Sequence, residues 1–124
     1  MTTTRETLLA SAPPTVQAID CPELGASVHL RVMSGADREQ LENELTRRRE
    51  RKQDLVGIKF ALLRRVICEP DGTLTFGPDD EAAFMSIDCR VVERLFSVAQ
   101  TMNLLDDRSV EDHLGNSPAP GDAG

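Results

Sequence analysis

The sequence predicts a small, mainly helical α+β domain, with about four helices and a short N-terminal β-hairpin packed on them. Apolar residues recur at helical spacing in three segments, and residues 27–32 alternate between apolar and polar as in a half-buried strand. Turns that contain Gly or Pro separate these segments. We therefore expect one domain at residues 15–114, between a flexible Thr-rich arm at residues 1–14 and a disordered tail at residues 115–124.

The composition argues against several classes of function. The formal net charge is −7 and the pI is near 4.8, which opposes binding to nucleic acid or to anionic lipid. No apolar run approaches the roughly 20 residues that cross a bilayer. The three cysteines have no regular spacing, as is typical of reduced thiols in a cytosolic compartment. We expect a soluble intracellular protein with no nucleic-acid or membrane partner.

Two short strands are expected near the N-terminus. Residues 15–20 contain β-branched side chains, and residues 21–26 contain Pro and Gly, which favour a turn. The alternating residues 27–32 follow directly. This order predicts an antiparallel hairpin, which must lie on the helices because two strands alone are marginally stable.

The first long helix is expected to begin after Ser34. Ser34 can accept a hydrogen bond from the first helical turn, and Asp37 stands in the capping-box position three residues later. The helix should run to about Lys52, with a break at Gln53-Asp54. Its apolar stripe is thin and consists of Ala36, Leu41 and Leu45.

The most apolar segment, residues 54–68, is expected to form the central helix. At about 100° per residue, its apolar side chains fall on two seams. The first seam consists of Leu55, Ile58, Leu62 and Val66. The second seam consists of Val56, Phe60, Leu63 and Ile67. A helix with two seams is contacted from two directions. We expect the second seam to pack inside the domain, and the alternative is a seam that stays partly open to a partner helix or a second copy.

The chain after this helix carries clear turn and capping signals. Residues 69–72, Glu-Pro-Asp-Gly, predict a turn, and residues 73–76 predict a brief extended segment. Gly77 followed by Pro78 predicts the start of a short helix that reaches about Ser86.

A longer helix is expected at residues 89–104, with Asp88 as its cap. Its apolar side chains form a single wide stripe that consists of Val91, Val92, Leu95, Phe96, Val98, Ala99 and Met102. We expect this stripe to pack on the first seam of the central helix and to form the core with it. A weak further helical turn is expected at residues 106–114.

No arrangement of residues indicates an enzyme, a cofactor or a metal site. His29 and His113 lie far apart, and no pair of His, Cys or carboxylate residues has metal-ligand spacing. We expect Cys68 and Cys89 to be small buried hydrophobic residues. The carboxylates at residues 79–81 are explained by the start of a helix, where acidic side chains complement the helix dipole.

The basic run at residues 47–52 allows two interpretations. It could contact phosphate or an acidic partner, or it could be a solvated helix end. The acidic net charge of the chain favours the solvated helix end.

Four stretches carry a family resemblance. Residues 21–39 run from Cys-Pro-Glu-Leu-Gly through a short strand into a Ser-capped charged helix, and residues 60–80 contain an apolar helix, an Asp-Gly turn, a Phe and an acidic helix start. Residues 92–104 contain a Leu-Phe pair followed by Asn-Leu, and residues 110–118 form a closing segment. In this order, residues 21–118 resemble the tail assembly chaperones of long-tailed bacteriophages.

The resemblance implies a chaperone without enzymatic activity in the cytoplasm of the infected host. Such proteins coat the tape measure protein, keep it soluble, recruit tail tube subunits and leave the finished tail, so the resemblance implies absence from the mature virion. Many are made in two lengths through a ribosomal frameshift, and a longer form of this chain would begin its extension at residues 116–124.

In the alternative in which the second seam stays partly open, the seam and part of the basic run form a partner-binding surface. Its members are Val56, Phe60, Leu63, Ile67, Arg47, Arg48 and Arg51. The expected partners are the tape measure protein, the tail tube protein through a frameshifted form, and a second copy of the chain. The alternative functions are a small structural component of the tail or connector and a regulatory nucleic-acid-binding protein.

Overall fold

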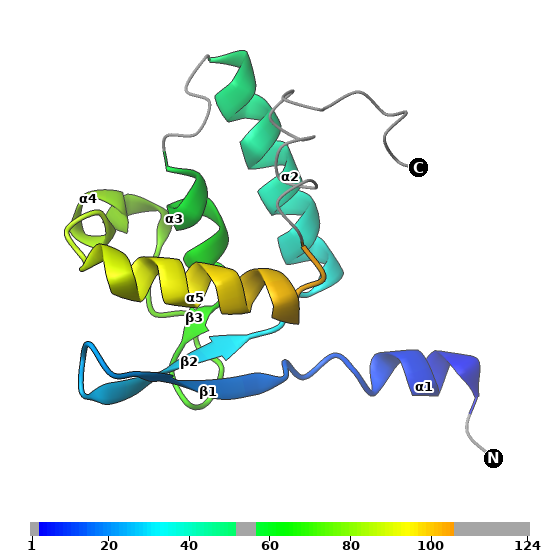
Figure 1. Ribbon diagram of the computed structural model, residues 1–124. Helices are drawn as coiled ribbons and strands as arrows, with labels where there is room; N and C mark the ends of the chain where they lie inside the picture. The colour runs from blue at the N-terminus through cyan, green and yellow to red at the C-terminus, as the bar shows by residue number, and fades with distance from the viewer. Residues whose placement is uncertain (1–2, 52–56, 106–124) are drawn as a thin grey trace, which may run out of the picture.

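The computed structural model describes residues 3–51 and 57–105, and it has an α+β fold. The elements in chain order are α1 (Thr4–Leu9), β1 (Val16–Cys21), β2 (Ala26–Arg31), α2 (Gly35–Glu50), α3 (Ile58–Leu63), β3 (Ile67–Cys68), the 3-10 helix η1 (Pro78–Asp80), α4 (Glu81–Phe84) and α5 (Cys89–Met102). Figure 1 shows the sheet below the helices, with α5 across the front and α2 standing above it. The predicted fold class is confirmed.

The predicted N-terminal hairpin is confirmed. Strands β1 and β2 pair antiparallel in a register that runs from Val16 opposite Arg31 to Cys21 opposite Ala26. The turn closes with a 2.8 Å hydrogen bond from the Leu24 N–H to the Cys21 carbonyl, and Gly25 supplies a φ of +65°. An ion pair of 2.7 Å between Glu23 and Arg94 ties this turn to α5.

The expectation of one helix over residues 54–68 is wrong. Helix α3 spans six residues, and Ile67–Cys68 form the strand β3, which extends the sheet to the order β1-β2-β3. The Arg65 N–H donates to the Leu62 carbonyl at 3.0 Å and the Val66 N–H donates to the Leu63 carbonyl at 3.1 Å, which closes the helix. Ile67 and Cys68 then pair with Leu30 and His29 of β2, whose second edge would otherwise be unpaired.

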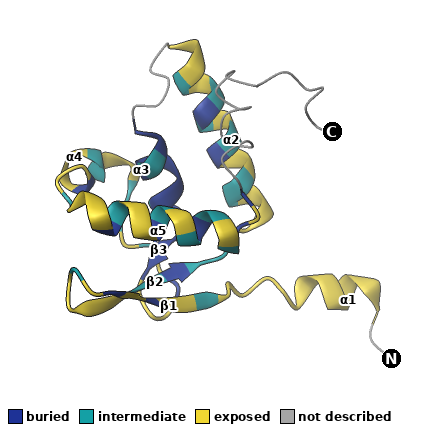
Figure 2. Ribbon diagram, viewed as in Figure 1, coloured by how far each residue is buried: buried dark blue, intermediate teal, exposed yellow. Residues whose placement is uncertain are grey.

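Helix α3 is the centre of the core. Five of its six residues are buried, and it packs against both α5 and α2. Figure 2 shows buried residues along α3 and on the inner sides of α2 and α5. The Phe84 ring of α4 lies 5.2 Å from the Phe60 ring, centroid to centroid, and 5.9 Å from the Phe76 ring. The predicted core pair of helices is confirmed, and the described part of the second seam packs inside the domain.

The predicted cap of α2 is confirmed, but one of the three residues that we expected in its buried apolar stripe is exposed. The Ser34 hydroxyl accepts from the Asp37 N–H at 3.1 Å, and the Asp37 carboxylate accepts from the Ser34 N–H at 3.3 Å. Leu41 and Leu45 are buried, whereas Ala36 is exposed because it lies in the first turn, before the helix reaches the core. Helix α2 ends at Glu50, and the predicted break at Gln53-Asp54 lies outside the described residues.

Helices α4 and α5 form where the sequence predicts them, but both end a few residues before the predicted ends. Helix α4 ends at Phe84 rather than at Ser86, and α5 ends at Met102 rather than at Leu104.

Asn103 joins the end of α5 to the start of α2. Its Oδ1 accepts a hydrogen bond from the Met33 N–H at 2.7 Å, and its carbonyl accepts one from Arg38 at 3.1 Å. The predicted helical turn at residues 106–114 and the tail at residues 115–124 lie outside the described residues.

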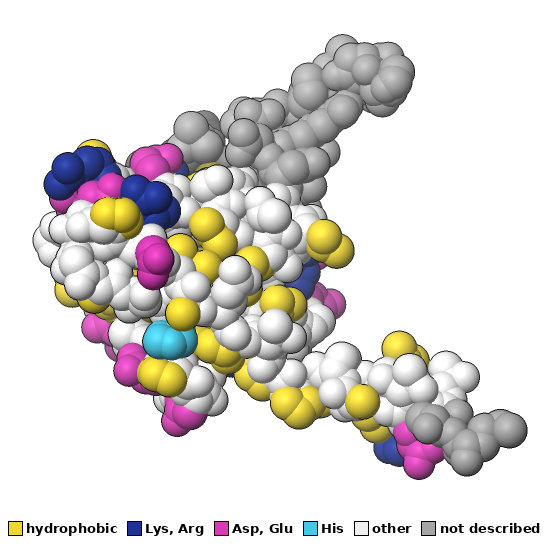
Figure 3. Space-filling model, turned by 60° about the horizontal axis from the view of Figure 1, so that its bottom comes forward, with side chains coloured by type: hydrophobic (Ala, Val, Ile, Leu, Met, Phe, Trp, Pro, Cys, Tyr) yellow, Lys and Arg dark blue, Asp and Glu magenta, His cyan; other side chains and the backbone are white. Residues whose placement is uncertain are grey.

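The arm contains a short helix. Every residue of α1 is exposed, and a capping box between Thr3 and Glu6 starts the helix. The arm leads away from the body (Figure 1), and hydrophobic side chains are visible along it in Figure 3. A six-residue helix without burial has little intrinsic stability in water.

The strained backbone of Leu104 should lower the free energy of unfolding of the domain. This residue has a φ of 55° with a side chain that is 88% exposed, and its β-carbon makes this conformation unfavourable by about 1–2 kcal/mol. We expect Leu104→Gly to raise the free energy of unfolding by about 0.5–1 kcal/mol. This gain is smaller than the strain that is relieved, because glycine loses more conformational entropy than leucine when the chain folds. Urea denaturation measures the change. Leu104→Ala is the control, because it removes the exposed side chain but keeps the β-carbon. Equal stability of the Gly and Ala variants would contradict the assignment of strain.

Candidate partner-binding surfaces

Two hollows in the surface are candidates for partner binding. The first, the arginine hollow, lies beside the C-terminal half of α2 and has a volume of about 440 Å³. It is lined by Glu44, Arg47, Arg48, Arg51, Phe60, Arg64, Pro78 and Glu81. The second, the arm hollow, lies between the arm and the start of α2 and has a volume of about 470 Å³.

Glu44 is the centre of the ion pairs in the arginine hollow. One carboxylate oxygen, Oε1, contacts Arg64 at 3.0 Å and Arg65 at 2.9 Å, and the other, Oε2, contacts Arg48 at 3.1 Å. Arg65 is only 5% exposed and also donates to the Ala61 carbonyl at 2.7 Å. One carboxylate therefore holds α2 against the turn that follows α3.

The surroundings of Glu44 keep it ionised. Partial burial alone would raise the pKa of the Glu44 carboxyl, but the hydrogen bonds and charges of Arg65, Arg48 and Arg64 outweigh that effect and lower the pKa from its ordinary value of 4.5. Burial lowers the pKa of Arg65 against the opposing effect of Glu44. The cluster thus stays charged at neutral pH.

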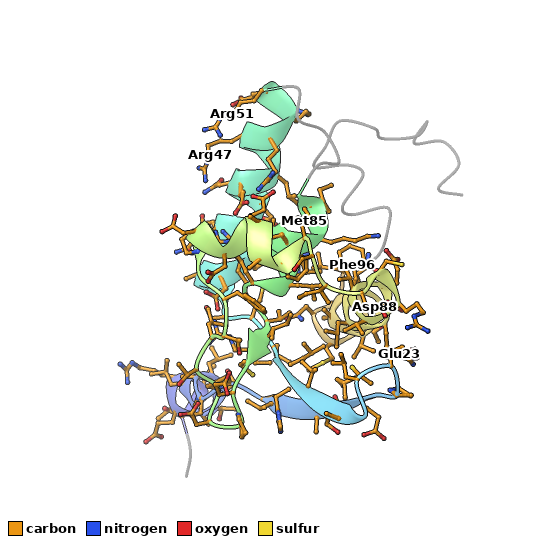
Figure 4. The ribbon with its side chains drawn as sticks, turned by 90° about the vertical axis from the view of Figure 1, so that its left-hand side faces the viewer. Glu23, Arg47, Arg51, Met85, Asp88 and Phe96 are labelled. Carbon is orange, nitrogen blue, oxygen red and sulfur yellow. The ribbon has the colours of Figure 1, made fainter. Side chains whose placement is uncertain are left out.

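Arg47 and Arg51 face outward beside this cluster. Figure 4 shows both side chains on the same side of α2. Both residues are exposed, and within residues 3–51 and 57–105 neither side chain forms an ion pair. The hollow therefore presents two guanidinium groups whose charge is not balanced by a described carboxylate.

Gly57 lies beneath the ion pair that crosses the hollow. Arg48 contacts Glu81 at 3.4 Å, and a β-carbon on Gly57 would lie 2.5 Å from Arg48 Nη1 and 2.6 Å from Glu81 Oε2. The φ of Gly57 is also +76°, which favours glycine. The positive φ therefore favours glycine here, and a β-carbon would displace the ends of the Arg48 and Glu81 side chains.

The arm hollow is lined by apolar and polar residues. Its apolar residues are Leu8, Leu9, Ala12, Pro14, Val32 and Met33. Leu8 is 67% exposed and Leu9 is 52% exposed. A neighbouring hollow of about 290 Å³ shares Val32 and Met33 and adds Met102 and Leu104, so the apolar surface continues to the end of α5.

The structure places the predicted partner-binding residues in two different environments. Arg47, Arg48 and Arg51 line the arginine hollow, whereas Val56 lies outside the described residues. Phe60, Leu63 and Ile67 are buried in the core, with at most 5% exposure. These three side chains therefore belong to the core, and Phe60 also lines the floor of the arginine hollow.

Several residues of the hollows were not anticipated from the sequence. The contact between Glu44 and Arg64 joins residues that are 20 positions apart, and no local pattern reports it. Glu44 and Arg48, by contrast, stand four apart on one helix, which is a recognisable pairing signal. Leu8 and Leu9 could have been found as the two large apolar residues of the arm.

The cysteines follow the expectation only in part. Cys68 is buried, but Cys89 is exposed at the start of α5, so the expectation for Cys89 is wrong. Burial raises the pKa of the Cys68 thiol and also that of the buried Cys21. The helix stripe begins with Val91, which leaves Cys89 on the open side.

Within residues 3–51 and 57–105, no three His, Cys, Asp or Glu side chains are grouped so that they could hold a metal ion. In the same ranges, no helix has the length and apolar character to cross a membrane.

Comparison with solved structures identifies a neighbour of similar fold, described as the structure of the bacteriophage HK97 tail assembly chaperone. The TM-score is 0.57 at 23% sequence identity, and the match covers 81% of this chain and 98% of that chain. At this identity the likeness establishes a common fold. No family model matches the chain, and no curated protein matches it.

The ion pairs of Glu44 should make stability depend on pH. Because its pKa is lowered in the folded state, its contribution is complete above the ordinary pKa of 4.5 and is lost as the pH falls through the folded pKa. We expect Glu44→Gln to be less stable than the wild type by about 2 kcal/mol at pH 7. The difference should shrink as the pH is lowered towards 3. Glu39→Gln, on the exposed side of α2, is the control; a pH-independent difference for Glu44→Gln would contradict the assignment.

A β-carbon at Gly57 should destabilise the fold. We expect Gly57→Ala to lower the free energy of unfolding by about 1–2 kcal/mol, because the alanine is strained at positive φ and displaces Arg48 and Glu81. Chemical denaturation measures this change. Gly35→Ala, where a β-carbon meets no atom within 4 Å, should leave stability unchanged or raise it. Similar losses in both variants would count against the close approach at Gly57.

Proposed function

We propose that this protein is a phage tail assembly chaperone. It binds the tape measure protein, keeps it soluble, and helps to recruit tail tube subunits through a frameshifted longer form. It acts in the cytoplasm of the infected host without enzymatic activity, and it does not remain in the mature virion.

The fold is the observation that carries this proposal. A solved structure described as a tail assembly chaperone aligns over 98% of its own length with this chain. The order of motifs in residues 21–118 supports the same family independently, because it rests on short sequence patterns and not on the alignment of coordinates.

The arm hollow is the surface that we assign to the tape measure protein. A long helical partner that is kept soluble must have its apolar side covered, and a groove lined by apolar and polar residues can accept an amphipathic helix. Leu8 and Leu9 stand on one side of the hollow, and Val32 and Met33 stand on the other. Burial of the exposed leucines against a partner would contribute roughly 1–2 kcal/mol each.

Co-expression with the tape measure protein from the same phage tests the proposal. We expect the tape measure protein to become soluble and to co-purify with the wild-type chain. The double variant Leu8→Ser/Leu9→Ser should reduce the co-purified amount severalfold, because it removes the apolar side of the hollow. Leu24→Ser, at an exposed residue of the hairpin turn outside both hollows, is the control and should bind normally.

Two outcomes would contradict this function. No gain in the solubility of the tape measure protein, with no co-purification, would exclude the chaperone role. Mass spectrometry of purified particles that finds the chain in stoichiometric amounts would identify a structural component of the tail or connector.

A further inference from the structure

We propose that the arginine hollow is a binding site for an acidic peptide segment whose two carboxylates stand one helical turn apart. The proposal concerns a surface different from the arm hollow, and it does not rest on the proposed function. It follows from the charges, the spacing and the fixed positions of the residues that line the hollow.

The charges of the hollow do not balance. Its lining contains four arginines and two glutamates, in a chain whose formal net charge is −7. Glu44 contacts Arg48 and Arg64, and Glu81 contacts Arg48. Both carboxylates of the lining are therefore engaged inside the hollow. Arg47 and Arg51 form no ion pair with any described residue, so the excess positive charge lies on their two side chains.

The spacing of Arg47 and Arg51 selects the ligand. Residues four apart on a helix have β-carbons about 5–6 Å apart, and two like charges at this spacing disfavour the helix slightly. Two carboxylates at i and i+4 of a partner helix have the same separation. Each guanidinium offers a planar fork that can bind a carboxylate with two parallel hydrogen bonds. A partner with this spacing satisfies both arginines at once.

The rest of the hollow is held in place before binding. Glu44 fixes Arg48 and Arg64 at 3.0–3.1 Å, and Gly57 allows Arg48 and Glu81 to meet above the start of α3. Phe60 and Pro78 add an apolar part to the lining. A site with its walls already ordered loses less entropy on binding.

The same residues disfavour nucleic acid. A nucleic-acid backbone carries closely spaced phosphates and needs an extended basic surface, whereas Glu44 and Glu81 place two negative charges within this hollow. A peptide with only two carboxylates brings fewer negative charges near Glu44 and Glu81, and each of its carboxylates can pair with one arginine. The chemistry of the hollow therefore fits an acidic protein segment.

Fluorescence anisotropy with labelled peptides tests the proposal on the purified full chain. The probe is a helix-forming Ala/Gln peptide with two glutamates at i and i+4, and the comparison peptide has the same composition with the glutamates at i and i+2. At low ionic strength we expect the first peptide to bind at least about fivefold more tightly, because residues two apart do not share a helix face. The variant Arg47→Gln/Arg51→Gln should weaken binding about tenfold or more.

The control variant is Arg5→Gln/Arg49→Gln, which removes the same total charge from exposed positions that do not line the hollow. It should retain binding and the preference between peptides. Equal loss in both double variants, no preference between the peptides, or no binding at about 1 mM peptide would overturn the proposal. A short single-stranded oligonucleotide that binds more tightly than the acidic peptide would also overturn it, in favour of a phosphate ligand. Circular dichroism confirms that both variants are folded.

Discussion

The arrangement of the helices depends on the Glu44 carboxylate. It compensates three guanidinium groups, from Arg48 on its own helix and from Arg64 and Arg65 in the turn after α3. Without this charge, the basic half of α2 would be repelled by that turn, and the nearly buried Arg65 would carry an uncompensated charge. The turn leads directly into β3, so the same carboxylate holds α2 beside the start of the third strand.

The short length of α3 decides which surfaces remain open. Its apolar side chains face α5 on one side and α2 with Phe84 on the other, so both described seams are used inside the domain. Open apolar surface lies instead at the arm, where Leu8 and Leu9 stand beside Val32 and Met33. The charged and the apolar hollow thus adjoin opposite ends of α2: Arg47 and Arg51 line the first, and Gly35 and Asp37 line the second.

Signals confined to a few residues could be predicted well from the sequence. Ser34 with Asp37, Gly77 with Pro78, and Asp88 each start a helix through hydrogen bonds within three residues, and the structure places each helix start there. The change from helix to strand between Leu63 and Ile67 could not be predicted, because the apolar residues on either side of Arg64 and Arg65 fit a buried helix and a short buried strand equally well. Only part of the arginine hollow could be predicted from the sequence. The basic run is evident there, but the contact between Glu44 and Arg64 joins residues 20 positions apart.

The most direct test of this account is a double-mutant cycle of Glu44→Gln and Arg65→Met, with the free energy of unfolding measured by urea denaturation. Glu44→Gln leaves Arg65 charged and without its carboxylate, whereas the double variant removes both charges. We predict that Glu44→Gln destabilises by much less in the Arg65→Met background, with a coupling energy of about 1.5–3 kcal/mol. Additive effects, with a coupling energy within about 0.3 kcal/mol of zero, would contradict the central role of Glu44.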